Sequence, residues 1–132
     1  MSSKPVPTPD AETAPFWEAV AEGVLKIQKC AGCNEHVFYP RLVCPHCMSD
    51  ELDWVCVSGR ARIHALTVVH RSTAPFRDDL PFAVAIVELE EGPRMMTRVL
   101  TDAPETLRID DPVKVHFAPQ GDGPPLPFFQ PA

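Results

Sequence analysis

The segment Cys30-Ala31-Gly32-Cys33, followed after ten residues by Cys44-Pro45-His46-Cys47, decides the fold of this chain. Each Cys-x-x-Cys pair is typical of a tight turn that directs two thiolates toward one point, and two such turns facing each other form a tetrahedral four-sulfur cage. We therefore predict a metal site whose ligands are Cys30, Cys33, Cys44 and Cys47. Four free thiols or two disulfides are the alternatives. Zinc is the expected ion, and iron is the alternative ion.

The number of ligands predicts what the metal does. Four thiolates fill a tetrahedral coordination sphere and leave no position for water or substrate, so we expect a structural site. His36 and His46 lie near the cysteines in the sequence, but we interpret both as loop residues outside the ligand set. Cys56 lies in the alternating run 54–57 and is predicted to be a strand residue that is at least half-buried.

Composition limits the classes of function that this chain can have. Its 132 residues suffice for one compact domain or two small modules, and its net charge of -6 argues against nonspecific binding of nucleic acid. No run of about 18 apolar residues is present, so no segment is expected to cross a membrane. The start of the chain lacks the apolar core of a signal peptide, which together with the clustered thiols predicts a cytoplasmic location.

The N-terminal region is predicted to be a mobile, proline-containing arm followed by a short helix. Thr13 can cap this helix, and Gly23 can end it. Phe16 and Val20 recur at helical spacing. Two interpretations remain open: the helix packs on its own domain, or it uses Phe16 and Trp17 to dock on a partner.

The rest of the chain has the pattern of a mainly β protein. We count five barrel strands, including the one around Trp54, and five strands with short turns suit an OB-fold barrel. The predicted strands are 52–57, 62–70, 82–89, 95–100 and 113–117. The predicted fold is therefore an N-terminal helix, a four-cysteine zinc ribbon and a five-stranded OB-fold. The predicted parts are an arm and helix (1–23), a zinc ribbon (24–59), an OB-fold (60–119) and a Pro-rich tail (120–132) that is disordered or lies along a partner.

No sequence motif of a catalytic site is present. Three histidines fall on predicted strands, and we interpret them as solvent-facing or core-edge residues: His64, His70 and His116. The paired acids Glu90-Glu91 and Asp110-Asp111 are interpreted as solvated turn charges.

Arginines are the better candidates for binding a ligand. Those in the long polar loop 71–81 and on the following hairpin could meet a phosphorylated ligand, although solvated surface arginines are the alternative. The candidates are Arg71, Arg77, Arg94 and Arg98.

The order of these features resembles one known family. The shared segments are Pro15-Phe16-Trp17, Cys30-x-x-Cys33, Tyr39-Pro40-Arg41, Cys44-Pro45-x-Cys47, Trp54, Ser58-Gly59-Arg60, Thr67-Val68-Val69-His70, the run from Pro81 to Leu89, and Val113-Lys114-Val115. Over about residues 13–120 the chain resembles the small acyl-CoA-associated proteins that join a rubredoxin-like zinc ribbon to an OB-fold.

The resemblance implies a non-catalytic accessory subunit. Members of that family associate with thiolase-like enzymes, which include thiolases, aldolases and acetyltransferases, or with MaoC-type enoyl-CoA hydratases. It implies that this chain docks on such an enzyme and helps to bind or position the acyl-CoA. The alternative is a module that binds single-stranded nucleic acid, because ribbons and OB-folds both do so. A stand-alone enzyme that uses a histidine is a third hypothesis.

Overall fold

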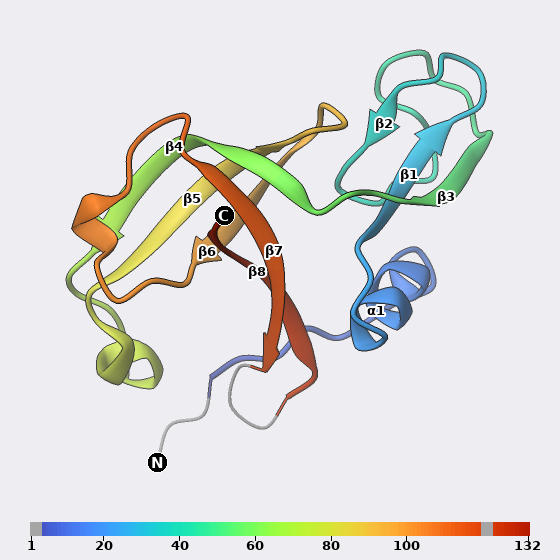
Figure 1. The fold of residues 1–132 in the computed structure, drawn as a ribbon. Coiled ribbons are helices and arrows are strands. Elements are labelled where there is room, and N and C mark those ends of the chain that lie inside the picture. Colours follow the sequence, from blue (N-terminus) through green and yellow to red (C-terminus); the bar gives the residue numbers. More distant parts are fainter. Residues whose placement is uncertain (1–3, 120–122) are drawn as a thin grey trace.

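The structure, a computed structural model, describes residues 4–119 and 123–132 (Figure 1). The parts of the predicted arm and tail at residues 1–3 and 120–122 lie outside the described residues. The elements are α1 (Ala14–Ala21), β1 (Lys26–Cys30), β2 (His36–Val37), β3 (Leu52–Cys56), β4 (Arg60–Val69), η1 (Ala74–Asp79), β5 (Phe82–Leu89), β6 (Arg94–Val99), η2 (Pro104–Thr106), β7 (Pro112–Pro119) and β8 (Pro125–Pro131). Figure 1 shows α1 and the small β1–β3 sheet on one side of the molecule and the barrel on the other. No helix of the described residues is long and apolar enough to cross a membrane.

Helix α1 begins and ends with defined hydrogen bonds. At its start, Thr13 occupies the N-cap position, but its side chain makes no capping bond, contrary to the prediction. Asp10 organises this turn instead, because its Oδ1 atom accepts a hydrogen bond from the Thr13 N–H at 3.0 Å. At the other end, Gly23 has a φ of +78°, and the Val24 N–H donates to the Ala19 carbonyl at 2.9 Å. This is a Schellman ending, so the predicted role of Gly23 is confirmed.

The ribbon sheet has the order β2-β1-β3, with both outer strands antiparallel to β1. Strand β3 pairs with β1 along its whole length, with Gln28 opposite Trp54. The prediction that the Trp54 strand is a barrel strand is therefore wrong. Periodicity identified a strand but could not choose its sheet, because pairing depends on where the chain goes after the second cysteine pair.

The barrel is closed and has the order β4-β5-β6-β8-β7, with β7 returning to β4. All neighbouring strands are antiparallel except β6 and β8, which are parallel at Val99 and Phe129. The predicted mainly β fold, with an N-terminal helix, a four-cysteine cluster and a closed five-stranded barrel, is confirmed.

The fifth barrel strand is β8, which the sequence prediction assigned to a Pro-rich tail. Proline normally disfavours a strand, because it has no N–H for the ladder. The prolines of β8 all occupy odd-numbered positions: Pro125, Pro127 and Pro131. The backbone groups at odd-numbered positions of β8 face β6, because the Leu100 N–H donates to the Phe129 carbonyl (2.7 Å) and Thr97 Oγ1 donates to the Pro127 carbonyl (3.1 Å). The intervening residues remain free to pair with β7, so the prediction of a tail is wrong for residues 125–131.

One hydrophobic core joins the helix, the ribbon and the barrel. Phe16 and Val20 from α1 and Ile27 from β1 pack in the same cluster as barrel residues such as Phe129. Phe16 is only 2% exposed, so it fixes α1 to its own chain and is not a docking residue. Trp17 is half-buried against this core and crosses Phe16 edge-on, with ring centroids 5.0 Å apart.

The connection between β3 and β4 crosses β7 very closely. Gly59 is buried, has a φ of +79°, and accepts a hydrogen bond at its carbonyl from the Val115 N–H at 2.8 Å. A Cβ atom at this position would lie 2.5 Å from Val115 Cγ1. Only glycine allows both the left-handed backbone and this approach.

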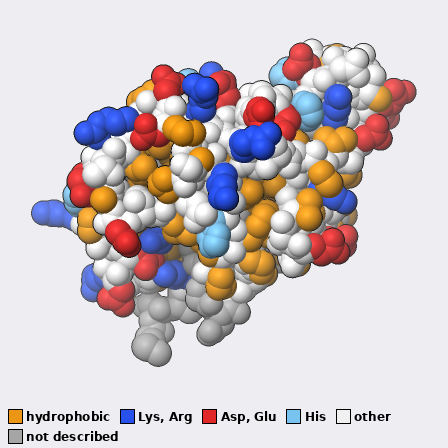
Figure 2. Space-filling model, in the orientation of Figure 1, with side chains coloured by type: hydrophobic (Ala, Val, Ile, Leu, Met, Phe, Trp, Pro, Cys, Tyr) orange, Lys and Arg blue, Asp and Glu red, His pale blue; other side chains and the backbone are white. Residues whose placement is uncertain are grey.

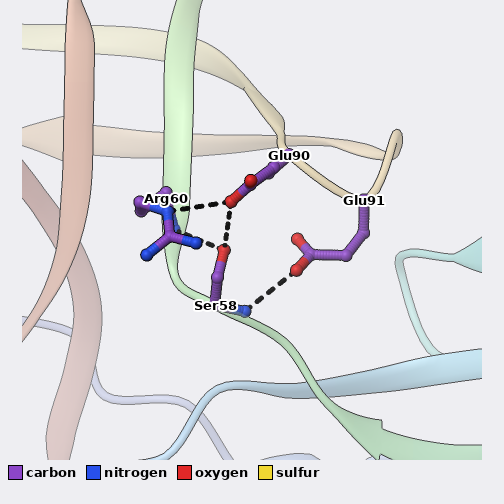
Figure 3. A network of polar contacts seen from close by, with 4 residues as sticks. All are labelled: Ser58, Arg60, Glu90 and Glu91. Atoms are coloured by element: carbon purple, nitrogen blue, oxygen red, sulfur yellow. Dashed lines mark hydrogen bonds and ion pairs between the residues drawn. The ribbon is translucent and has the colours of Figure 1, made fainter.

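The turn between β5 and β6 also holds the connection between β3 and β4 in place (Figure 3). The Ser58 N–H donates to Glu91 Oε2 at 2.9 Å, and the Ser58 hydroxyl donates to Glu90 Oε2 at 3.0 Å. Arg60 Nε donates to the same Glu90 oxygen at 2.9 Å. The hydrogen bonds from Arg60 and then Ser58 lower the pKa of Glu90 below its ordinary 4.5. Glu90 and Glu91 lie in a turn, and Glu90 is exposed, as interpreted from the sequence; both carboxylates also hold this connection in place.

Candidate functional site

The first cysteine turn follows directly from β1. Cys30 ends the strand, and its N–H donates to the Glu35 carbonyl at 2.9 Å. The Asn34 N–H returns to the Cys30 carbonyl at 2.8 Å, which closes the turn around Cys33. Asn34 has a φ of 62°, a left-handed conformation that asparagine tolerates better than most residues.

The second cysteine turn begins at Cys44 and repeats the geometry of the first. The Cys44 N–H donates to the Ser49 carbonyl at 2.8 Å, and the Met48 N–H donates to the Cys44 carbonyl at 2.9 Å. Met48 has a φ of 68°, which matches the left-handed residue of the first turn. The two turns therefore present two equivalent pairs of thiols to each other.

All four predicted ligands come together. Cys30 Sγ lies 3.5 Å from Cys47 Sγ, and Cys33 Sγ lies 3.7 Å from Cys44 Sγ. The four sulfur atoms lie within 4.8 Å of one another. A tetrahedral zinc ion with Zn–S bonds of about 2.3 Å would have sulfur–sulfur edges of about 3.8 Å. The donor set and its dimensions therefore fit a zinc ion in a closed four-thiolate site.

The pKa values of two thiols of the cluster move in opposite directions. Burial opposes ionisation of Cys30, but hydrogen bonds from the Cys33 backbone, the Cys47 thiol and the Gly32 backbone outweigh it and lower the pKa of Cys30 to about 7. The Glu35 backbone favours the Cys33 thiolate, but burial and the neighbouring thiols outweigh that bond and raise the pKa of Cys33 to about 12. One thiolate thus suppresses the next, and a divalent ion would remove this repulsion.

Three other side chains of metal-binding type lie outside the cage. The only metal-binding group found among the described residues consists of the four cysteines, so His36 and His46 are not part of it. Cys56 is a residue of β3, as predicted, but it is exposed, so the prediction of a half-buried side chain is wrong. It lies opposite Lys26 at the end of the ribbon sheet, where nothing in the core covers it.

Two of the four candidate arginines are held by carboxylates of this chain. Both lie on the outer side of β6. Arg94 Nε lies 3.3 Å from Glu88 Oε1, and Arg98 Nη1 lies 3.1 Å from Asp79 Oδ2. The guanidinium of Arg98 also lies over the ring of Phe82, 4.7 Å from its centroid. These contacts reduce the positive charge that either arginine offers to a ligand.

The other two arginines are more accessible. Arg71 follows β4, and Arg77 lies in η1; both side chains are exposed and form no ion pair within the described residues. The structure thus separates the four candidates into two paired residues on β6 and two exposed residues in the long loop. Three histidines are also exposed, in agreement with their solvent-facing interpretation: His64, His70 and His116.

Sequence patterns did not predict two hollows on the surface. One is a cleft of about 430 Å³ between the ribbon and the β5–β6 turn. The other is a mainly apolar groove of about 220 Å³ where α1, the loop after β2, β6 and β8 meet. Both are formed by residues far apart in the chain, so no local pattern could have indicated them.

The barrel order and the four-cysteine turns define a zinc ribbon–OB-fold protein. Two family models match in the same order: the rubredoxin-like zinc ribbon domain of ChsH2 at residues 17–53 and the C-terminal OB-fold domain of ChsH2 at residues 54–118. The chain belongs to this ChsH2 (DUF35) family.

Proteins with several different names are similar to this chain in sequence. A DUF35 domain-containing scaffold protein of Methanothermobacter thermautotrophicus is 35% identical over 80% of this chain and 81% of its own length. A probable enoyl-CoA hydratase alpha subunit of Thermomonospora curvata is 33% identical over 98% of this chain, but the chain spans only 40% of that protein's length. A solved structure titled Ltp2-ChsH2(DUF35) aldolase contains a chain that is 32% identical, with a TM-score of 0.84 and coverage of 96% of this chain and 98% of that one.

Proposed function

We propose that this chain is a non-catalytic accessory subunit. It docks on a thiolase-like acyl-CoA enzyme (a thiolase, an aldolase or an acyltransferase) and helps to bind or position the acyl-CoA. The observation that carries the proposal is the likeness to the chain in the Ltp2-ChsH2(DUF35) aldolase structure, which extends over nearly the full length of both chains. The relatives named scaffold protein and hydratase alpha subunit support a role beside a catalytic subunit.

The chemistry of the metal site agrees with a non-catalytic role. Zinc held by four cysteines has no open position at which water or substrate could react. Its contribution would be stability, because the ribbon buries few large side chains of its own around the cysteines: Val37 and, in part, Leu52.

The apolar groove supplies a surface that fits docking. Its rim includes Met96, which is 71% exposed, and Tyr39, which is 47% exposed, and Trp17 contributes to the same groove. Exposed apolar side chains around a hollow are typical of surfaces that a protein partner covers. Trp17 thus keeps the docking role that burial excludes for Phe16.

The exposed arginines of the long loop are the proposed contacts to the acyl-CoA phosphates. Within residues 4–119 and 123–132, no carboxylate pairs with Arg71 or Arg77, so neither has to release one before it binds a phosphate. Arg94 and Arg98 would first have to leave Glu88 and Asp79, so we expect a smaller contribution from them.

The experiment that tests this proposal is affinity capture of the tagged chain from extracts of its source cells, with mass spectrometry of the retained proteins. Retention of a thiolase, an aldolase or an acyltransferase in near-equal amount is expected. Met96→Lys should abolish that retention, whereas Ile109→Lys, an equally large change at an exposed site in the η2–β7 loop, should not. Retention of nucleic acid, or of no acyl-CoA enzyme, would contradict the proposal.

A further inference from the structure

The larger of the two unpredicted hollows is formed by both modules. One wall comes from the ribbon, on and beside β2 and at the second cysteine turn, and the other from the β5–β6 turn. The polar lining residues are Glu35, His36, His46, Glu88, Glu91 and Arg94. Figure 1 shows this turn reaching from the barrel toward the ribbon. A ligand in this cleft would therefore contact the ribbon and the barrel together.

The cleft is negatively charged. Glu35, Glu88 and Glu91 contribute three carboxylates, against the single guanidinium of Arg94. That guanidinium is already engaged by Glu88 at 3.3 Å. The remaining carboxylates of Glu35 and Glu91 form no ion pair within the described residues, so their charge stays available to a cation.

Glu91 is held in place in the turn that forms one wall of the cleft. Its Oε2 atom accepts the Ser58 N–H at 2.9 Å, which fixes the side chain (Figure 3). Its Oε1 atom is buried and has no hydrogen-bond partner among the described residues. Because this oxygen is closed off by the protein, Glu91 contributes its negative charge to the cleft but not a direct contact to a ligand.

The two walls are held in fixed positions relative to each other. The Ser58 bonds to Glu90 and Glu91 tie the β5–β6 turn to the connection between the modules, and Gly59 packs that connection against Val115. A ligand therefore meets a cleft that is already formed and loses little affinity to ordering it.

We propose that this cleft is a docking site for a basic segment of the partner enzyme, with a lysine or arginine side chain inserted between the ribbon and the β5–β6 turn. The inference rests on the proposed function for the identity of the partner, and on charge complementarity for the chemistry of the inserted side chain. Arginine suits the site better than lysine, because its fork can donate two hydrogen bonds to the exposed carboxylate of Glu35.

The first test uses the zinc-loaded full chain and a capped tetra-arginine peptide, with binding followed by backbone amide shifts. Saturable binding with shifts at Glu35, His46 and Gly92 is expected. Glu35→Lys should weaken it by about tenfold or more, whereas Glu51→Lys should change it by less than about twofold. Both substitutions reverse an exposed ribbon charge, but only Glu35 lines the cleft. Equal weakening by both variants, or no saturable binding, would overturn the proposal.

The second test measures the affinity of the captured partner enzyme for the same two variants over a range of salt concentrations. Glu35→Lys should weaken the complex and reduce its salt dependence, and Glu51→Lys should leave both unchanged. A complex that is indifferent to Glu35→Lys would refute the docking site while leaving the proposed function intact. Failure to capture any acyl-CoA enzyme, with peptide binding still lost only in Glu35→Lys, would refute the proposed function and leave the cleft as a basic-peptide site.

Discussion

The side-chain amide of Gln28 pairs with the backbone of Arg41 as a strand would. Gln28 Nε2 donates to the Arg41 carbonyl at 2.8 Å, and Gln28 Oε1 accepts from the Arg41 N–H at 2.7 Å. Gln28 is only 5% exposed and lies in the middle strand of the ribbon sheet. This pair fixes the segment that carries Tyr39, so it positions the rim of the apolar groove.

Gln28→Leu should destabilise the chain by about 1–3 kcal/mol, because it leaves two backbone groups of Arg41 without partners. Chemical denaturation measures the loss. Gln130→Leu is the matched control: it makes the same change at a half-buried strand position whose side chain forms no hydrogen bond with the part of the chain that the structure describes. Equal losses in the two variants would show that the pairing with Arg41 contributes nothing.

Gly59→Ala should destabilise the chain by about 3 kcal/mol or more, because it combines a left-handed backbone with a clash against Val115. Gly23→Ala has nearly the same φ, with nothing within 4 Å of the added Cβ, so it should lose only about 1 kcal/mol. Thermal unfolding compares the two. Val115→Ala combined with Gly59→Ala should recover part of the difference, and an unchanged difference would rule out the clash as its source.

The chain should bind one zinc ion, and Cys33→Ala should abolish that binding and lower the melting temperature. The expected reason is that three thiolates cannot close the cage, while the ribbon has little core of its own. Metal analysis and calorimetry provide the readouts. Cys56→Ala removes the one cysteine outside the cage and should keep both the zinc and the stability. Iron in the purified chain, or equal effects of the two variants, would contradict the assignment.

Stability at low pH should depend on Asp79. Partial burial acts against its ionisation, but hydrogen bonds from Lys4 and Arg98 outweigh it and place the pKa of Asp79 below its ordinary 3.8. Because the pKa of Asp79 is lower in the folded state than in the unfolded state, its ionisation stabilises the fold at pH values above the unfolded-state pKa. This stabilisation is lost as the pH falls through the folded-state pKa. Asp79→Asn should therefore cost about 1 kcal/mol at pH 7, after allowance for solvent screening, and almost nothing near pH 2. Chemical denaturation across this pH range measures the effect. The control variant Asp78→Asn, at an exposed neighbouring residue, should have a free energy of unfolding close to that of the unsubstituted chain.

The cysteine spacing and the β patterns predicted much of the fold because they are local. Each Cys-x-x-Cys turn is closed by hydrogen bonds within six residues, so its sequence is sufficient to specify it. The same holds for Gly23, whose left-handed conformation ends α1. Non-local pairing could not be predicted in this way: the Trp54 strand joined the ribbon, and β8 replaced it in the barrel.

The candidate site likewise has features that the sequence predicted and features that depend on non-local contacts. The clustering of the four cysteines followed from their spacing, whereas the charge that the arginines can offer depended on neighbours that only the fold supplies, such as Asp79 beside Arg98. The acidic cleft has no sequence signal at all, because Glu35 and Glu91 come together only when the β5–β6 turn reaches the ribbon.

The most direct test of the central claim is steady-state acyl-CoA turnover by the captured enzyme, measured with and without this chain. The chain alone should show no turnover. Adding the chain should raise the partner's kcat/KM for acyl-CoA by about tenfold or more, with saturation at a fixed stoichiometry. Turnover by the isolated chain, or partner kinetics that do not change at saturating chain, would contradict the claim that this protein is an accessory subunit of an acyl-CoA enzyme.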